Sequence, residues 1–473
     1  MNQTNKILPN NEKVFLYSFG NILPKFISFA TIPLFSFFLS KKDIGTYDLL
    51  LGSISLFIPI ITFQLGDAYY RWMCKYGKSA NNSKDILKTV IVFTFYSHLI
   101  FSCTLYILIK SIEINFPIWF LPVIFSSSII TLFQFVARAY NNIKIYSASG
   151  IINSAGIISF STIYFFSINS SLNGIIYSYF LSNILTLFYL VIKLKLYQKI
   201  HFGNYNHAIL KELLFFSIPL IPNALSWWLV SISNRYIIAI YMGVEANGLY
   251  AVASKIPSIL FIFNSVFLLL FQDIVFNNLN KENDESYYSE FFSKVFTLQI
   301  SLSIVIIAFS KILTKILFST IYLETYKIVP IILLGVLLTN FSAFWGIFYL
   351  EKKKTIGILT TSLLGAIINI FFTYLMIEKL GLYSAALGTV LGFITILLIR
   401  IKQMREYIKI KFNYTLIISL FIFFIFSVII SQRLYNSFLE IVFMGGSLLL
   451  FYFYNHLLIR KTATQIKTYV KLK

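Results

Sequence analysis

About fourteen apolar runs, each long enough to cross a lipid bilayer, follow one another along this 473-residue chain. A crossing helix needs about 20 mostly apolar residues. The chain is 58% hydrophobic and 12% charged, whereas soluble domains carry about 25% charged residues. The sequence therefore predicts an all-α, polytopic membrane bundle, with spans at residues 17–39, 48–72, 87–109, 117–138, 146–168, 172–193, 214–241, 249–272, 292–316, 326–349, 356–377, 380–400, 413–432 and 438–459.

Basic residues are divided unequally between the two sides of this predicted bundle. The connections on the side of the N-terminus hold 28 of the 39 Lys and Arg residues, Arg400 among them, and the opposite connections hold 8. The other 3, Lys25, Arg235 and Lys255, lie inside helices. Because cytoplasmic loops carry the excess of Lys and Arg, we expect both termini in the cytoplasm. The net charge of +21 then reflects membrane orientation, and no nucleic-acid partner is expected.

Three short patterns recur along the chain at a nearly constant distance. Their offsets are 203, 210 and 207 residues (Gly45 and Gly248, Lys144 and Lys354, Gly174 and Gly381). The alternative is chance recurrence of Gly-x-Tyr. Because six helices that occur twice keep their topology, the repeat predicts two lobes related by an axis along the membrane normal. The expected division is an N-terminal lobe of helices 1–6 (1–195), a cytoplasmic connection (196–213), a C-terminal lobe of helices 7–12 (214–411), and two additional helices with a cytoplasmic tail (412–473).

The segment from Leu214 to Pro257 combines apolar sequence with buried-looking polar residues. It is predicted to form one long helix, a tight break at Gly243–Gly248 and a second helix. Lipid does not hold a cation cheaply, so Arg235 and Lys255 must face protein or a water-filled cavity.

The same segment carries a family resemblance. Its Pro219-x-x-Pro222, paired Trp, Asn234-Arg235 and Gly248-x-Tyr250 resemble the seventh and eighth helices of bacterial polysaccharide-transport flippases. The later run Lys352–Thr355, Asn369 and Gly381-x-x-x-Ala385-Ala386-x-Gly388-Thr389 does so too. These O-antigen or repeat-unit flippases belong to the multidrug/oligosaccharidyl-lipid/polysaccharide exporter superfamily.

The resemblance covers essentially the whole chain and implies a V-shaped bundle of two six-helix lobes plus two C-terminal helices. It implies a multi-pass protein of the bacterial inner membrane that moves undecaprenyl-diphosphate-linked oligosaccharide, an O-antigen or capsule repeat unit, to the periplasmic leaflet by alternating access. The lipid bilayer is then its environment, and a polysaccharide polymerase and a chain-length regulator of lipopolysaccharide biosynthesis are further expected partners.

Four cations are candidates for binding the diphosphate by charge-assisted hydrogen bonds: Lys25, Arg71, Arg235 and Lys255. Each also has a simpler explanation, which is weakest for Lys25 because it lies about eight residues inside its helix. Arg71 fits an ordinary positive-inside anchor. Lys255 fits a snorkelling side chain, and Arg235 fits a partner of Glu245.

Two carboxylates are candidates for coupling transport to H⁺ or Na⁺. They are Asp67 and Asp273, although Asp67 also lies four residues before Arg71 and would neutralise it on one helix face. The membrane potential is an equally open driving force.

Other classes of function have less support in the sequence. We find no phosphate-binding loop, dinucleotide fingerprint, zinc-protease pair or nucleophile elbow, and the four histidines lie far apart. No cofactor, metal or catalytic residue is therefore expected, and the chain is predicted to be a transporter and not an enzyme. Two alternatives remain: a cation-coupled multidrug antiporter of the same superfamily, and a membrane polysaccharide polymerase.

Overall fold

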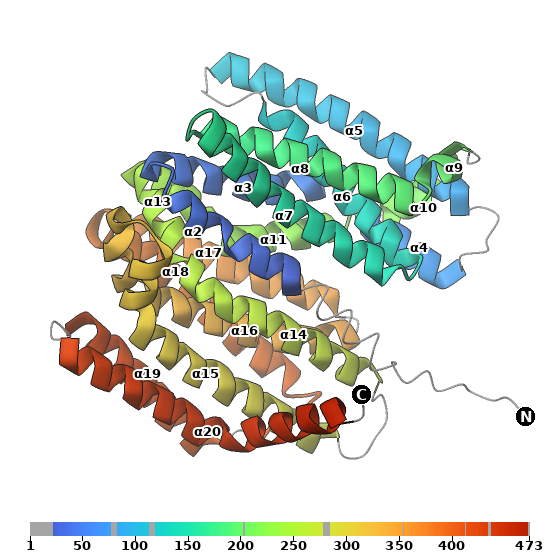
Figure 1. Ribbon diagram of the computed structural model, residues 1–473. Coiled ribbons are helices and arrows are strands. Elements are labelled where there is room, and N and C mark those ends of the chain that lie inside the picture. Colours follow the sequence, from blue (N-terminus) through green and yellow to red (C-terminus); the bar gives the residue numbers. More distant parts are fainter. Residues whose placement is uncertain are drawn as a thin grey trace, which may run out of the picture. The chain divides into compact units, whose positions relative to one another are not determined.

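The computed structural model describes residues 22–76, 83–112, 119–201, 204–277, 284–352, 354–411, 413–433 and 437–471. These residues are helical almost throughout, so the all-α prediction is confirmed (Figure 1). Twelve of the described helices are long and apolar enough to cross a membrane, and a bent pair makes thirteen. The shorter apolar helix Ile22–Ser36 lies in the first predicted span, whose residues 17–21 are outside the described residues. Each of the fourteen predicted spans thus has a helical counterpart.

The chain divides into two compact units, Met1–Ile232 and Ser233–Lys473. In the first unit α7 and α8 lie side by side, and α6 packs on α8 and on α4 (Figure 1). An apolar core at one end of this unit includes Tyr69, Val90 and Val136. The helices of the first unit are α2 (Thr31–Ser36), α3 (Lys41–Ile61), α4 (Leu65–Tyr76), α5 (Ser83–Ile112), α6 (Phe120–Ala139), α7 (Ile143–Ser167), α8 (Leu172–Lys193), α9 (Leu196–His201), α10 (His207–Ser217) and α11 (Leu220–Ser231).

The second unit repeats this order of elements. Its pair α17 and α18 packs as α7 and α8 do, α16 packs on α18, and α19 and α20 both lie against α15 (Figure 1). The starts of α13, α16, α17 and α18 follow those of α3, α6, α7 and α8 by 203, 209, 212 and 210 residues. The helices of the second unit are α12 (Ser233–Met242), α13 (Val244–Ala253), α14 (Lys255–Asn277), α15 (Asp284–Leu317), the 3-10 helix η1 (Thr320–Lys327), α16 (Val329–Glu351), α17 (Thr355–Leu380), α18 (Leu382–Met404), α19 (Tyr414–Arg433) and α20 (Ser437–Lys471).

Several helices bury small and polar residues on their packed faces and expose large apolar residues on their outer faces. On α8, Ser182 and Asn183 are buried while the Phe188 side chain is 65% exposed. Lipid tails are as apolar as these outer side chains, so helix association in a membrane depends on close packing and hydrogen bonds. Gly156 of α7 provides the close packing, because a Cβ there would lie 2.4 Å from Ser182 Oγ. Helices with small and polar residues on the packed face and large apolar residues on the outer face are typical of a membrane bundle.

The seventh and eighth predicted spans are more broken than expected. Residues 214–241 do not form one long helix but run through the end of α10, all of α11 and most of α12. The axis bends by 40° between α10 and α11, where Pro219 lacks the N–H that a continuous helix would need. The predicted break at Gly243–Gly248 is limited to Gly243, which has a φ of 88°. Helix α13 begins at the next residue, Val244.

The boundary between the units lies after Ile232, and the division into lobes at residue 214 stays a prediction. Helix α10 packs on α4 and α5, and α11 packs on α3. The indole Nε1 of Trp228 on α11 donates to the backbone oxygen of Gly52 on α3, at 2.8 Å. These contacts explain why α10 and α11 group with the first unit although they are neighbours of α12 in sequence.

Candidate functional site

Lys25 and Arg71 both lie in the first unit. Lys25 is half-buried in the short apolar helix Ile22–Ser36, in the turns before α2. It lies beside Pro24, whose ring is so close to Gly150 of α7 that an added Cβ would be 2.9 Å from Cγ. This packing fixes the Lys25 backbone next to α7. Arg71 is exposed on α4, and its guanidinium carbon lies 4.1 Å from the centre of the Phe216 ring on α10.

The carboxylate of Asp67 interacts electrostatically with a cation that was not among the predicted site residues. This cation is Arg138 on α6. The Arg138 guanidinium carbon is 5.0 Å from the ring centre of Tyr70, 5.6 Å from that of Phe135 and 5.9 Å from that of Tyr146. A cation beside several aromatic rings is stabilised by their quadrupoles. Helix α6, which packs on α4, thus places a cation, Arg138, within electrostatic range of the carboxylate predicted for ion coupling.

Arg235 and Lys255 lie in the second unit, both half-buried. Arg235 follows the buried Asn234 at the start of α12. The Asn234 amide nitrogen donates to Asn369 Oδ1 at 2.9 Å and to the backbone oxygen of Ala385 at 2.7 Å. Because these bonds tie α12 to α17 and α18, they also fix the direction in which the next side chain, Arg235, leaves the helix.

Lys255 is the first residue of α14, directly after the short break at Ser254. Its backbone oxygen accepts a hydrogen bond of 2.6 Å from Ser258 Oγ. Asp273 lies near the C-terminal end of the same helix, but its side chain is outside the described part of the structure. The two units thus hold two of the four predicted cations each.

One charged residue was assigned wrongly from the sequence. Arg400 was counted with the cytoplasmic connections, but its side chain is fully buried near the end of α18. The guanidinium donates to the backbone oxygen of Ser342 on α16 at 2.7 Å. It also donates to the hydroxyls of Thr361 and Ser362 on α17, both at 3.1 Å. The side chain therefore joins three helices, which explains why the protein retains a cation at the end of an apolar span.

The model of a family described as "Polysaccharide biosynthesis protein" matches residues 11–271. No curated protein matches the sequence.

Solved structures share the fold at low sequence identity. A lipid II flippase, MurJ, in an inward closed conformation superposes with a TM-score of 0.71 at 14% identity, over 96% of this chain and 100% of that chain. A multidrug resistance MATE family transporter of the MOP superfamily, facing inward, gives 0.59 at 14% identity, over 84% of this chain and 96% of that one. An outward-facing MATE family transporter also gives 0.59, at 12% identity, over 83% of this chain and 95% of that chain.

All three relatives are multi-helix transporters, and the flippase aligns over nearly the whole of both chains. Because the family model matches more than half of the sequence, the protein belongs to the polysaccharide biosynthesis protein family, and it has the fold shared by the MurJ flippase and the MATE transporters.

Proposed function

We propose that this protein is a flippase that moves an undecaprenyl-diphosphate-linked oligosaccharide from the cytoplasmic to the periplasmic leaflet of the bacterial inner membrane. The observation that carries the proposal is the membership of a polysaccharide biosynthesis family together with a fold that matches a lipid flippase over 96% of the chain. The oligosaccharide is an O-antigen or capsule repeat unit, and both termini face the cytoplasm, where the excess of Lys and Arg lies.

Four cations would bind the diphosphate on its way across the membrane: Lys25, Arg71, Arg235 and Lys255. Each lies in or at the end of a helix of the bundle, and three of them are half-buried. A charge in such a position is costly unless it faces protein, water or a ligand of opposite charge. Arginine and lysine bind phosphate oxygens through charge-assisted hydrogen bonds, so a diphosphate matches these side chains.

The energy for export would come from the membrane potential. A potential of 100 mV is worth about 2.3 kcal/mol for each charge that crosses. An inside-negative potential drives a diphosphate dianion outward with up to roughly twice that free energy. If transport is instead coupled to H⁺ or Na⁺, Asp67 and Asp273 would bind the coupling ion. A polysaccharide polymerase and a chain-length regulator would use the exported product.

The test is translocation by the purified protein in liposomes. Undecaprenyl-diphosphate oligosaccharide is placed in both leaflets, and the fraction reached by an external glycosidase is measured over time. We expect accessible substrate to rise from about half toward completion in proteoliposomes and to stay at half in empty liposomes. A rate equal to that of empty liposomes would contradict the proposal.

A cation-coupled multidrug antiporter is the second candidate, favoured by the similarity to MATE transporters in both inward-facing and outward-facing states. The fold match to these transporters covers less of this chain than the match to the flippase does. Expression in a drug-sensitive strain separates the two candidates. An antiporter would raise resistance to cationic drugs, whereas a flippase would restore surface polysaccharide without changing resistance.

A further inference from the structure

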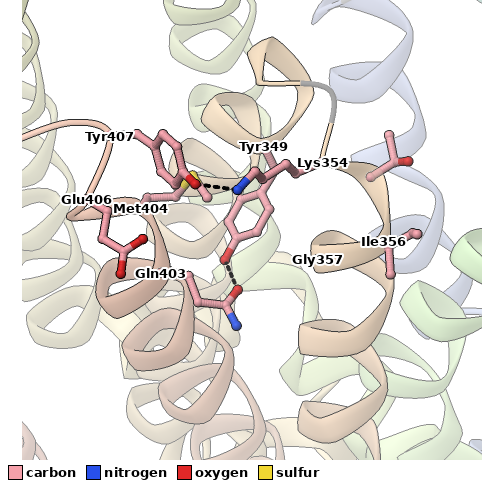
Figure 2. A pocket seen from close by; sticks show the side chains of 9 residues that line it. Tyr349, Lys354, Ile356, Gly357, Gln403, Met404, Glu406 and Tyr407 are labelled. Carbon is pink, nitrogen blue, oxygen red and sulfur yellow. Dashed lines mark hydrogen bonds between the residues drawn. The ribbon is translucent and has the colours of Figure 1, made fainter.

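A pocket lined by both polar and apolar residues lies in the second unit where α16 ends, α17 begins and α18 ends (Figure 2). Its volume is about 510 Å³, within the range of small-molecule sites. The side chains that matter for recognition are Tyr349, Lys354, Thr355, Gln403, Glu406 and Tyr407. None of them belongs to the cations assigned to the transported diphosphate.

The pocket lies at the level of the lipid headgroups. The apolar helices α16, α17 and α18 have 23, 26 and 23 residues, or about 35–39 Å at 1.5 Å per residue. The hydrocarbon core is about 30 Å thick, so helices of this length place their ends in the polar layer. A pocket formed by three such ends opens among headgroups.

One wall of the pocket is held rigidly. The Tyr349 side chain is 1% exposed, and its hydroxyl donates to Gln403 Oε1 at 2.6 Å (Figure 2). Gly357 lies against the ring, since a Cβ there would be 2.4 Å from Tyr349 Cε1. The guanidinium carbon of the buried Arg400 is 6.0 Å from the ring centre. The cavity is therefore shaped by packed side chains.

The charges around the pocket suit a single negative group. The Lys354 ammonium donates to the Tyr407 hydroxyl (Figure 2) and lies 4.2 Å from the centre of its ring. Lys402 and Arg405 are exposed on the neighbouring turns of the chain. The carboxylate lining the pocket is that of Glu406, while Glu351 pairs with Lys352 at 3.0 Å. Positive charge thus exceeds negative charge at these helix ends.

We propose that this pocket binds the headgroup of an anionic phospholipid of the phosphatidylglycerol type. Lys354 would contact the phosphate, and the Tyr407 hydroxyl and the Gln403 amide would bond to the glycerol hydroxyls. A phosphodiester carries one negative charge, which suits Lys354 better than a diphosphate does, because Glu406 repels further negative charge. Basic pockets between membrane helices are a recurrent mode of anionic-lipid binding.

The experiment measures lipid binding to the full-length protein in detergent micelles. Thermal unfolding is followed while dioleoyl-phosphatidylglycerol or dioleoyl-phosphatidylcholine is titrated in. We expect phosphatidylglycerol to bind at least ten-fold more tightly than phosphatidylcholine. Lys354→Gln should weaken phosphatidylglycerol binding about ten-fold or more, the usual effect of losing a hydrogen bond to a charged group, and Lys354→Arg should retain most of it.

The matched control is Lys379→Gln, which removes the same charge from the exposed last turn of α17, at its other end. It should bind phosphatidylglycerol as the wild-type protein does. Equal affinity for the two lipids, or unchanged affinity in Lys354→Gln, would overturn the proposal. Binding of soluble glycerol 1-phosphate as tightly as the lipid would also overturn it, since the site would then be one for a free phosphate ester. None of these readouts depends on flippase activity.

Discussion

The guanidinium of Arg400 and the backbone oxygen of Ser342 are 2.7 Å apart, and this bond joins α18 to α16 inside an apolar bundle. The same side chain reaches Thr361 and Ser362 on α17. Arginine suits this position because its planar fork of five N–H donors is matched to several fixed acceptors at once.

Arg400→Lys should therefore destabilise the second unit. A lysine ammonium keeps the charge but cannot reach the oxygens of two helices in the same planar geometry. We expect a loss of about 1.5–3 kcal/mol, the range for a hydrogen bond to a charged group, measured by thermal or denaturant unfolding in detergent. Arg405→Lys, on the exposed turn that follows, is the control and should change nothing. Equal stability of the two variants would show that the three bonds contribute little.

Asn234→Leu should reduce transport more than it reduces the amount of inserted protein. Asn234 holds α12 on α17 and α18 through Asn369 and Ala385, and the next residue is Arg235. Losing these hydrogen bonds and leaving Asn369 without this donor costs about 1–3 kcal/mol of stability. The bonds then no longer fix the direction in which the Arg235 side chain leaves the helix. Surface polysaccharide and protein level are measured in the same cells.

The control for this prediction is Ile240→Ala, because Ile240 is on the same helix and its side chain is 76% exposed. This variant should behave as wild type in both measurements. If Asn234→Leu transports normally at a normal protein level, the hydrogen bonds do not position Arg235.

Lys25→Ala and Arg235→Ala should each abolish surface polysaccharide while the protein still inserts into the membrane. Each change removes a proposed charge-assisted contact to the diphosphate, worth about 1.5–3 kcal/mol or roughly a ten- to 150-fold change in affinity. Complementation of a strain lacking its own flippase is the measurement. Arg433→Ala, at the exposed end of α19, should complement fully. Normal polysaccharide in both test variants would reject these two residues as substrate contacts.

Gly392→Ala should destabilise the α17–α18 pair. A Cβ at Gly392 would lie 2.7 Å from the backbone oxygen of Gly365 on α17, so the helices would have to separate. Overpacking of this kind costs about 1–3 kcal/mol and should lower the midpoint of thermal unfolding. Gly445→Ala is the matched control, because nothing lies within 4 Å of the added methyl group. Alanine favours a helix over glycine, so this variant should be as stable as wild type or slightly more stable.

The order and approximate number of the spans could be predicted from sequence because each depends only on local apolar length. The positions at which the helices bend or break, in contrast, depend on single residues. The bend between α10 and α11 lies at Pro219 and was underestimated, because a proline pair in an apolar run is compatible with a kinked continuous helix as well as with two helices. The positive-inside count treated Arg400 as a loop residue because its neighbours Lys402 and Arg405 are exposed.

The sequence by itself determined that this is a helical membrane protein of a polysaccharide family, because apolar length and family pattern are properties of the linear chain. Only the tertiary structure decided which polar residues meet. Asn234 with Asn369, Arg400 with Ser342 and Arg138 near Asp67 are separated by 135, 58 and 71 positions, and no periodicity links them. Partners at such distances are chosen by helix packing, since helices such as α7, α8, α15 and α17 each bury several Ser, Thr or Asn side chains.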